Sequence, residues 1–193
     1  MKKIYILLLF MGLTAFSQEF KIPGITLTEK DTVNYITLLS ITDPDALIVK
    51  LQYESYWSGG IISNFIVYQH NGTILKYDVF DNYKGKPKIK KSKLKKKAYP
   101  AYHKALEDCI AQNMLAIDSS KLNIQHRRTA DGVEVISIDD AVMEKFELWQ
   151  NGYKKSYASY AAPMFIAEKV EGADERQKFV NLLKHFEAVW DAK

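Results

Sequence analysis

The chain has 193 residues, a net charge of +4 and a single cysteine, and 47% of its residues are hydrophobic. This composition is typical of a folded globular protein with one domain. Because Cys109 has no second cysteine to pair with, an intramolecular disulfide and a CxxC metal or redox site are both excluded.

Residues 1–17 have the pattern of an export signal. Lys2 and Lys3 precede an apolar run at residues 4–13, and Ala-Phe-Ser at residues 15–17 matches a small–any–small cleavage site. The apolar run is too short to cross a bilayer, which takes roughly 20 residues. We therefore expect cleavage just before Gln18 and a mature protein that acts in the periplasm or outside the cell.

The first elements expected in the mature chain are a short helix and a strand. The helix falls within residues 30–40, where Tyr35, Ile36 and Leu39 share one side. The strand at residues 47–53 alternates in hydrophobicity, as a strand with one buried face does. The residues on its apolar face are Leu47, Val49, Leu51 and Tyr53.

Two Asn-Gly pairs, Asn71-Gly72 and Asn151-Gly152, predict β-hairpins. Each pair lies between segments rich in apolar and aromatic residues, and Asn-Gly favours the type I′ turn, in which both central residues have positive φ. Each pair is followed, five residues after its glycine, by a tyrosine: Tyr77 in the first hairpin and Tyr157 in the second.

An amphipathic helix is expected after each hairpin. The first helix has Pro100 at its start and the second has acidic residues at 174–175 in its first turn, both of which are typical of helix N-termini. Their apolar stripes match at an offset of 80 residues. The matched pairs are Tyr99 with Phe179, Tyr102 with Leu182, Leu106 with Phe186, Cys109 with Val189, and Ile110 with Trp190.

These elements predict an α+β fold made of two strand–strand–strand–helix units, roughly residues 44–118 and 131–193. The first strand of the second unit is placed at residues 133–138. The simplest arrangement is one antiparallel sheet with both helices on one face. The other face would then be exposed to solvent or would serve as a binding surface. Gene duplication accounts for the common offset; coincidence between two common motifs is the alternative.

A run of lysines separates the first hairpin from its helix. Residues 84–97 contain nine lysines and no acidic residue, whereas the rest of the mature chain has a net charge of −7. The candidate binding lysines are Lys84, Lys86, Lys88, Lys90 and Lys91. The strip could hold a protein or an anionic envelope component, or it could be an edge strand that lysines protect from aggregation. Nucleic acid is not expected, because no stacking aromatics lie between these lysines.

Four hairpin aromatics form a second candidate binding surface. They are Tyr68, Tyr77, Trp149 and Tyr157. Tyrosine and tryptophan are enriched at interfaces because they join a large apolar body to a polar tip. The alternative is that these rings pair across strands and only stabilise the sheet.

No catalytic, metal or cofactor motif is present in the sequence. The four histidines are not spaced as metal ligands, and Cys109 falls on the apolar stripe of its helix. We therefore expect an exported binding protein without a cofactor or a metal. The alternative is a hydrolase of the cell envelope with a dispersed site, for which His103, His126, Asp139 and Asp140 are the candidates.

Overall fold

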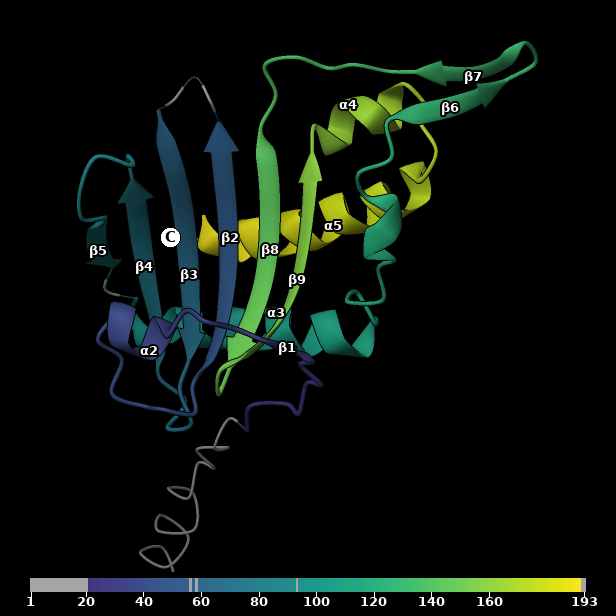
Figure 1. The fold of residues 1–193 in the computed structure, drawn as a ribbon. Coiled ribbons are helices and arrows are strands. Elements are labelled where there is room, and N and C mark those ends of the chain that lie inside the picture. Colours follow the sequence, from purple (N-terminus) through teal and green to yellow (C-terminus); the bar gives the residue numbers. More distant parts are fainter. Residues whose placement is uncertain (1–20, 56, 58, 93, 192–193) are drawn as a thin grey trace, which may run out of the picture.

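The computed structural model describes residues 21–55, 57, 59–92 and 94–191, so the predicted export signal lies outside the described residues. The main feature is a seven-stranded antiparallel sheet with the strand order β1-β9-β8-β2-β3-β4-β5 (Figure 1). Its strands are β1 (Glu29–Lys30), β2 (Leu47–Ser55), β3 (Gly60–Tyr68), β4 (Ile74–Asp81), β5 (Lys88–Ser92), β8 (Met143–Gln150) and β9 (Tyr153–Tyr160). Together with the helices, this sheet confirms the predicted α+β class.

Two long helices lie on the same face of this sheet, as expected. α3 (Tyr99–Ala111) and α5 (Ala173–Trp190) pass behind the strands in Figure 1. We call the covered side the helix face. Its core contains Leu47, Val49 and Leu51 of β2 together with residues of the predicted helix stripes. No helix within the described residues combines the length and the apolar character needed to span a membrane.

The opposite side of the sheet, which we call the open face, has partial cover. Asn34 caps α2 (Tyr35–Leu38) by accepting a hydrogen bond from the Thr37 amide, and this short helix crosses one end of the sheet (Figure 1). Tyr35 and Leu39 pack there against Ile48 and Trp149. The expectation that the open face is exposed to solvent or used for binding therefore does not hold at this end, where β2 is buried on both sides.

A buried arginine joins the start of α5 to the segment around η2 (Ser119–Lys121). Arg176 has no exposed surface, and its guanidinium donates hydrogen bonds to three carbonyl oxygens. Nε donates to Leu122 at 3.0 Å, Nη1 to Glu171 at 2.8 Å, and Nη2 to Ile124. The group also stacks 5.0 Å from the ring centre of Phe165, which belongs to α4 (Ala162–Ala167). A buried cation is tolerated here because its donors are paired with carbonyl groups.

Both Asn-Gly pairs lie in hairpin turns, but the turns differ. Asn151 and Gly152 form a two-residue loop with φ values of 53° and 79°, as a type I′ turn requires. The first loop joins Tyr68 to its strand partner Ile74, and of its Asn-Gly pair only Gly72 has positive φ. The type I′ prediction is therefore confirmed for the second hairpin and wrong for the first.

The longer first loop changes which face receives the matched tyrosines. Tyr77 pairs with Phe65 and packs on the open face, whereas Tyr157 pairs with Phe146 and packs on the helix face. Side chains alternate between faces along a strand, so a loop of different length moves the residue five positions after the glycine to the other side. The offset of 80 residues therefore does not relate equivalent positions in β4 and β9.

The expected first strand of the second unit, at residues 133–138, does not join the main sheet. β7 (Gly132–Val135) pairs with β6 (His126–Thr129) in a separate two-stranded sheet that extends past the end of the main sheet (Figure 1). β8 pairs instead with β2 of the first unit. Cys109 and Val189 differ as well, since Cys109 is fully buried and Val189 only partly so.

Candidate binding surfaces

The lysine strip follows an edge of the main sheet. In the described part of the chain, β5 pairs with β4 alone, and Lys84 and Lys86 lie in the loop between these two strands. All the described lysines of the strip are exposed. They are Lys84, Lys86, Lys88, Lys90, Lys91, Lys95, Lys96 and Lys97; Lys93 lies outside the described residues. The edge-strand alternative therefore fits Lys88, Lys90 and Lys91, which lie on β5, whereas the other described lysines of the strip lie before or after this strand.

These lysines have no acidic partner in the part of the chain that the structure describes. None of them lies within 4.0 Å of a carboxylate oxygen, although nine ion pairs form elsewhere in the described residues. Lys91 contacts the protein differently, with its Nζ 5.6 Å from the centre of the Tyr77 ring. The strip is therefore a positively charged edge whose ammonium groups are available to form ion pairs with an anionic partner.

The four aromatic residues do not form a binding surface. Tyr68, Tyr77, Trp149 and Tyr157 are between 0% and 4% exposed. Tyr68 and Tyr157 belong to the core of the helix face, and Tyr77 and Trp149 to the cluster under α2. The predicted exposed aromatic surface is wrong because elements that lie on opposite sides of the sheet cover the rings.

The hydroxyl groups explain how two of these tyrosines are buried. Tyr68 donates a hydrogen bond to the Tyr102 carbonyl at 2.9 Å, and Tyr157 donates one to the Leu115 carbonyl. Both acceptors lie on α3 or directly after it. A buried tyrosine needs a partner for its hydroxyl, and here the polar tips attach the sheet to the helix layer.

A polar hollow of about 340 Å³ lies on the open face beside the cover provided by α2. We use the term polar hollow for the site formed by Asp31, Tyr35, Lys50, Gln52, Lys145, Glu147, Lys154 and Ser156. Its floor comes from three adjacent strands, because Lys50 of β2 pairs with Glu147 of β8, which pairs with Ser156 of β9. Polar side chains that are far apart in the sequence therefore meet at one place.

Burial shifts the titration of two groups in the polar hollow. Lys50 Nζ donates to the Tyr35 hydroxyl at 3.0 Å and lies 5.2 Å from the centre of the Tyr35 ring. Desolvation lowers the pKa of Lys50, although the neighbouring Glu147 carboxylate opposes this shift. Desolvation and the same carboxylate raise the pKa of Tyr35, so its hydroxyl keeps its proton.

Reasoning from the sequence missed the polar hollow. The alternation that placed Leu47, Val49 and Leu51 on one face also places Lys50 and Gln52 on the other, and that signal was available. Nothing in the sequence showed that β8 lies beside β2, which brings Glu147 next to Lys50.

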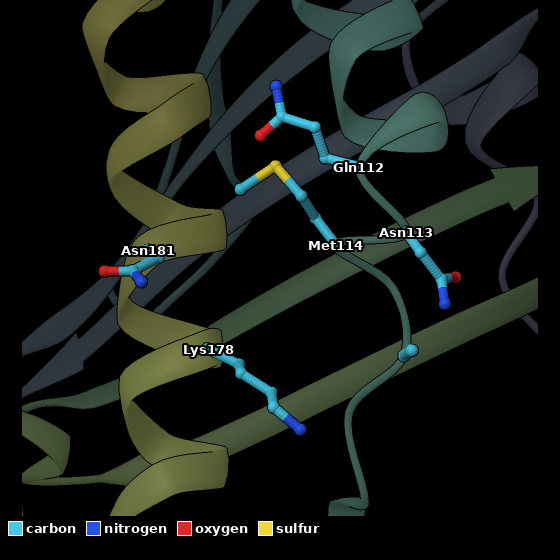
Figure 2. A pocket seen from close by; sticks show the side chains of 6 residues that line it. Gln112, Asn113, Met114, Lys178 and Asn181 are labelled. Atoms are coloured by element: carbon cyan, nitrogen blue, oxygen red, sulfur yellow. The ribbon is translucent and has the colours of Figure 1, made fainter.

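A second hollow, of about 360 Å³, separates the end of α3 from α5 (Figure 2). Gln112, Asn113 and Met114 line it from one side, and Lys178 and Asn181 from the other. Its one charged group already has a partner, since Lys178 Nζ lies 2.7 Å from Glu175 Oε1. Its lining of amides, a thioether and a paired lysine makes it less distinctive chemically than the polar hollow.

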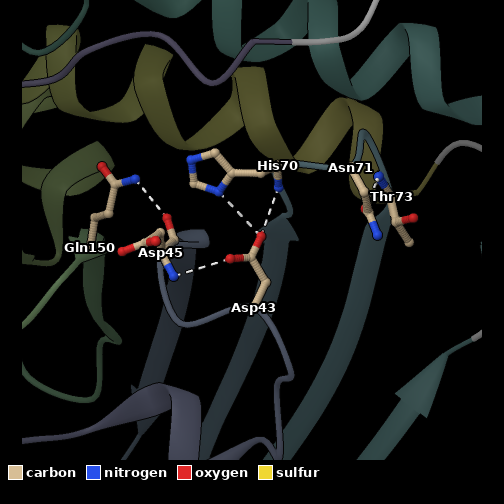
Figure 3. Close-up of polar contacts among 6 residues, drawn as sticks. All are labelled: Asp43, Asp45, His70, Asn71, Thr73 and Gln150. Carbon is tan, nitrogen blue, oxygen red and sulfur yellow. Dashed lines mark hydrogen bonds and ion pairs between the residues drawn. The ribbon is translucent and has the colours of Figure 1, made fainter.

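Asp43 connects two loops at one end of the sheet (Figure 3). Its Oδ2 accepts a hydrogen bond from the His70 amide at 2.7 Å and lies 3.2 Å from His70 Nδ1, while Oδ1 accepts from the Asp45 amide at 3.1 Å. Burial acts to raise the pKa of Asp43, but the two amide hydrogen bonds and His70 outweigh it and lower the pKa. The contacts hold the first hairpin against the loop that leads into β2.

The side chains considered as catalytic candidates in the sequence do not meet in one site but contact different parts of the molecule. His126 lies 3.2 Å from Glu171, and Asp140 accepts a hydrogen bond from Trp57 at 2.7 Å. Burial lowers the pKa of His103 and raises the pKa of the fully buried Cys109 to about 12. A thiol with this pKa is protonated at neutral pH and is not an activated nucleophile.

No group of three or more His, Cys, Asp or Glu side chains suited to holding a metal ion occurs among the described residues. Comparison with known proteins adds no assignment: no protein-family model matches the chain, and the curated proteins contain no match to it.

Proposed function

We propose that this chain is an exported binding protein that uses the lysine strip to hold an anionic partner, either a protein or a component of the cell envelope. The observation that carries the proposal is a row of eight exposed lysines with no carboxylate within ion-pair distance among the described residues. Charges that are already exposed and unpaired can meet an anion without losing an internal ion pair.

The location of the strip supports a role in binding. Among the described residues, β5 is the last strand of the sheet and has a neighbouring strand, β4, on one side only. Lys88 and Lys90 alternate with Ile89 and Lys91, which gives the edge positive charge on both faces. An extended anionic chain laid along this edge would meet lysines on either side of it.

Export is part of this proposal. It is supported by the pattern of residues 1–17, which has a basic start, an apolar stretch and small residues before Gln18. Outside the cytoplasm, the available anionic partners include acidic glycans, lipid headgroups and acidic protein surfaces. N-terminal sequencing of the protein recovered from its native host tests this part, because an uncleaved Met1 would contradict it.

The binding proposal is tested with three anionic probes: heparin, phosphatidylglycerol vesicles and poly-glutamate. We expect the purified protein to bind at least one of them, and we expect raising the salt concentration to weaken the binding, because salt screens exposed charges. Biolayer interferometry gives the affinity at each salt concentration. The probe that binds most tightly identifies the class of partner.

Two triple variants with equal charge changes separate the strip from general positive charge. One replaces Lys88, Lys90 and Lys91 with glutamine, and the control replaces three exposed lysines elsewhere, Lys30, Lys104 and Lys184. We expect the strip variant to lose at least about tenfold in affinity, or 1.4 kcal/mol, and the control to change little. Equal losses in both variants, or no binding of any probe by the wild type, would contradict the proposal.

A further inference from the structure

Three large apolar side chains are exposed beside the lysine strip. They are Ile62 of β3, Phe80 of β4 and Ile89 of β5, with exposed fractions of 45%, 36% and 41%. These strands are neighbours in the sheet, and the register pairs Ile62 with Phe80 (Figure 1). Exposed apolar groups that gather at one place, unlike scattered ones, mark a surface that contacts another molecule.

The end of α5 explains why two of these side chains are uncovered. The carbonyl oxygen of Trp190, the last residue of α5, accepts a hydrogen bond from Lys76 Nζ at 2.6 Å. Lys76 and Phe80 lie four positions apart on β4 and so share a face of the sheet. This is the helix face, because Phe80 pairs with Ile62, which pairs with Tyr53 of β2. The helix therefore ends before it reaches Ile62 and Phe80.

Lysines and apolar side chains lie together on both faces of this edge. On the helix face, Lys88 pairs with Phe80, and Lys90 lies two positions further along β5. On the open face, Ile89 and Lys91 lie side by side along the same strand. Each side of the edge therefore presents both positive charge and exposed apolar surface.

The acidic residues of this part of the chain are too few to neutralise the lysines. Between residues 78 and 97, eight described lysines and two carboxylates, Asp78 and Asp81, give a net charge of +6. Asp78 also accepts a hydrogen bond from Ser92 Oγ at 3.2 Å. The surface therefore fits a partner that is anionic and that also has an apolar part.

We propose that this edge docks on an anionic lipid surface, with its lysines at the lipid headgroups and Ile62, Phe80 and Ile89 inserted among them. The inference rests on the proposed function, because it uses the same lysines. Anionic lipids attract lysines near a membrane surface, and apolar side chains that enter the headgroup layer add to the binding. A headgroup layer can surround an edge from both faces. An acidic glycan, by contrast, has no apolar layer, and a folded protein partner would cover one face.

A fluorescent label at position 89 tests whether the edge enters the lipid. The full chain with Ile89→Cys is labelled with the environment-sensitive dye NBD, whose fluorescence rises in apolar surroundings. The label reacts at the introduced cysteine, because Cys109 is fully buried and its pKa is raised to about 12. Val133→Cys is the matched control, since Val133 is 66% exposed but lies on β7, outside the main sheet. Both variants keep the apolar run at residues 4–13, so its contribution is common to them.

We expect phosphatidylglycerol vesicles to raise the fluorescence of the label at position 89 at least about twofold. Phosphatidylcholine vesicles and heparin should leave it unchanged, because the first have no net negative charge and the second has no apolar layer. The label at position 133 should not respond to any of the three. No rise at position 89 with phosphatidylglycerol, or an equal rise at position 133, overturns the inference. Strip-dependent binding of heparin or poly-glutamate would in that case still support the proposed function.

Variants that remove apolar surface and keep every charge separate insertion from simple attraction. Ile62→Thr with Ile89→Thr keeps β-branched side chains on the strands, and we expect it to weaken binding to phosphatidylglycerol vesicles about fivefold. Its affinity for heparin should not change. Val133→Thr with Val135→Thr is the control and should change neither affinity, although both valines are exposed. Vesicle co-sedimentation gives the affinities.

Equal vesicle affinities of the wild type and the isoleucine variant overturn the inference, and so do equal losses in the isoleucine and valine variants. Should the double isoleucine variant fail to fold, Ile89→Thr on the edge strand decides alone. That single variant should still bind vesicles more weakly than the wild type while its heparin affinity stays the same, and unchanged vesicle affinity overturns the inference.

Discussion

The two faces of β2 belong to one strand but meet different surroundings. On the helix face, Leu47, Val49 and Leu51 are fully buried under α3 and α5. On the open face, Ile48 is buried under α2, whereas Lys50 and Gln52, further along the strand, lie in the polar hollow. The comparison shows that the long helices produce a continuous apolar core, while a helix of one turn leaves room for a polar site.

The largest effect is expected from Phe146→Ala on the helix face. Phe146 is fully buried and packs 5.4 Å from Phe186 of α5, measured between ring centres. Removing a buried ring leaves a cavity, so the free energy of unfolding should fall by about 4 kcal/mol. Urea denaturation followed by circular dichroism measures it. Ile89→Ala on the exposed edge is the control and should change stability by less than about 0.5 kcal/mol.

The second prediction concerns the buried arginine that supports the helix layer. Arg176→Leu fills similar space but leaves the carbonyls of Leu122, Glu171 and Ile124 without the donors they have now. We expect a loss of about 3 kcal/mol in the free energy of unfolding, since each buried acceptor without a partner is costly. Arg128→Leu, at an exposed site, is the matched control. Equal stability of the Arg176→Leu variant and the wild type would mean that the loop carbonyls find other donors.

The smallest effect is expected at Asp43, which joins loops at the end of the sheet rather than supporting either face. Its pKa is lowered in the folded state, so its contribution to stability is complete above the ordinary aspartate pKa of about 4 and is lost as the pH falls through the lower, folded value. We expect Asp43→Asn to be less stable than the wild type by about 1 kcal/mol at neutral pH. Urea denaturation at a series of pH values should show this difference shrinking in acid; a difference that is constant with pH would contradict the assignment.

Local patterns in the sequence predicted most elements correctly. The stripe of Leu106 and Cys109 matched α3, and the acidic residues after Gly172 marked the start of α5, where Gly172 has a φ of 86°. Asn151-Gly152 formed its type I′ turn. These predictions depend on residues within a few positions of one another. A short segment of sequence is therefore enough to make them.

Predictions that depended on distant residues were less successful. Tyr77 was matched with Tyr157, but the longer first loop placed the two rings on opposite faces. The segment around Val133 was assigned to the main sheet and pairs with β6 instead. Strand pairing over long separations is decided by the fit between whole faces, and no single segment contains that information.

The sequence by itself determined where the hairpins turn, which sides of α3 and α5 are apolar, and that the eight described lysines of the strip stay exposed, because charge and hydrophobic periodicity act locally. Only the tertiary structure decided that the four hairpin aromatics are buried and that Asp31, Lys50 and Glu147 gather in one polar hollow. The reason is that burial depends on which element covers a side chain, and here the covering elements and neighbouring strands come from distant parts of the chain.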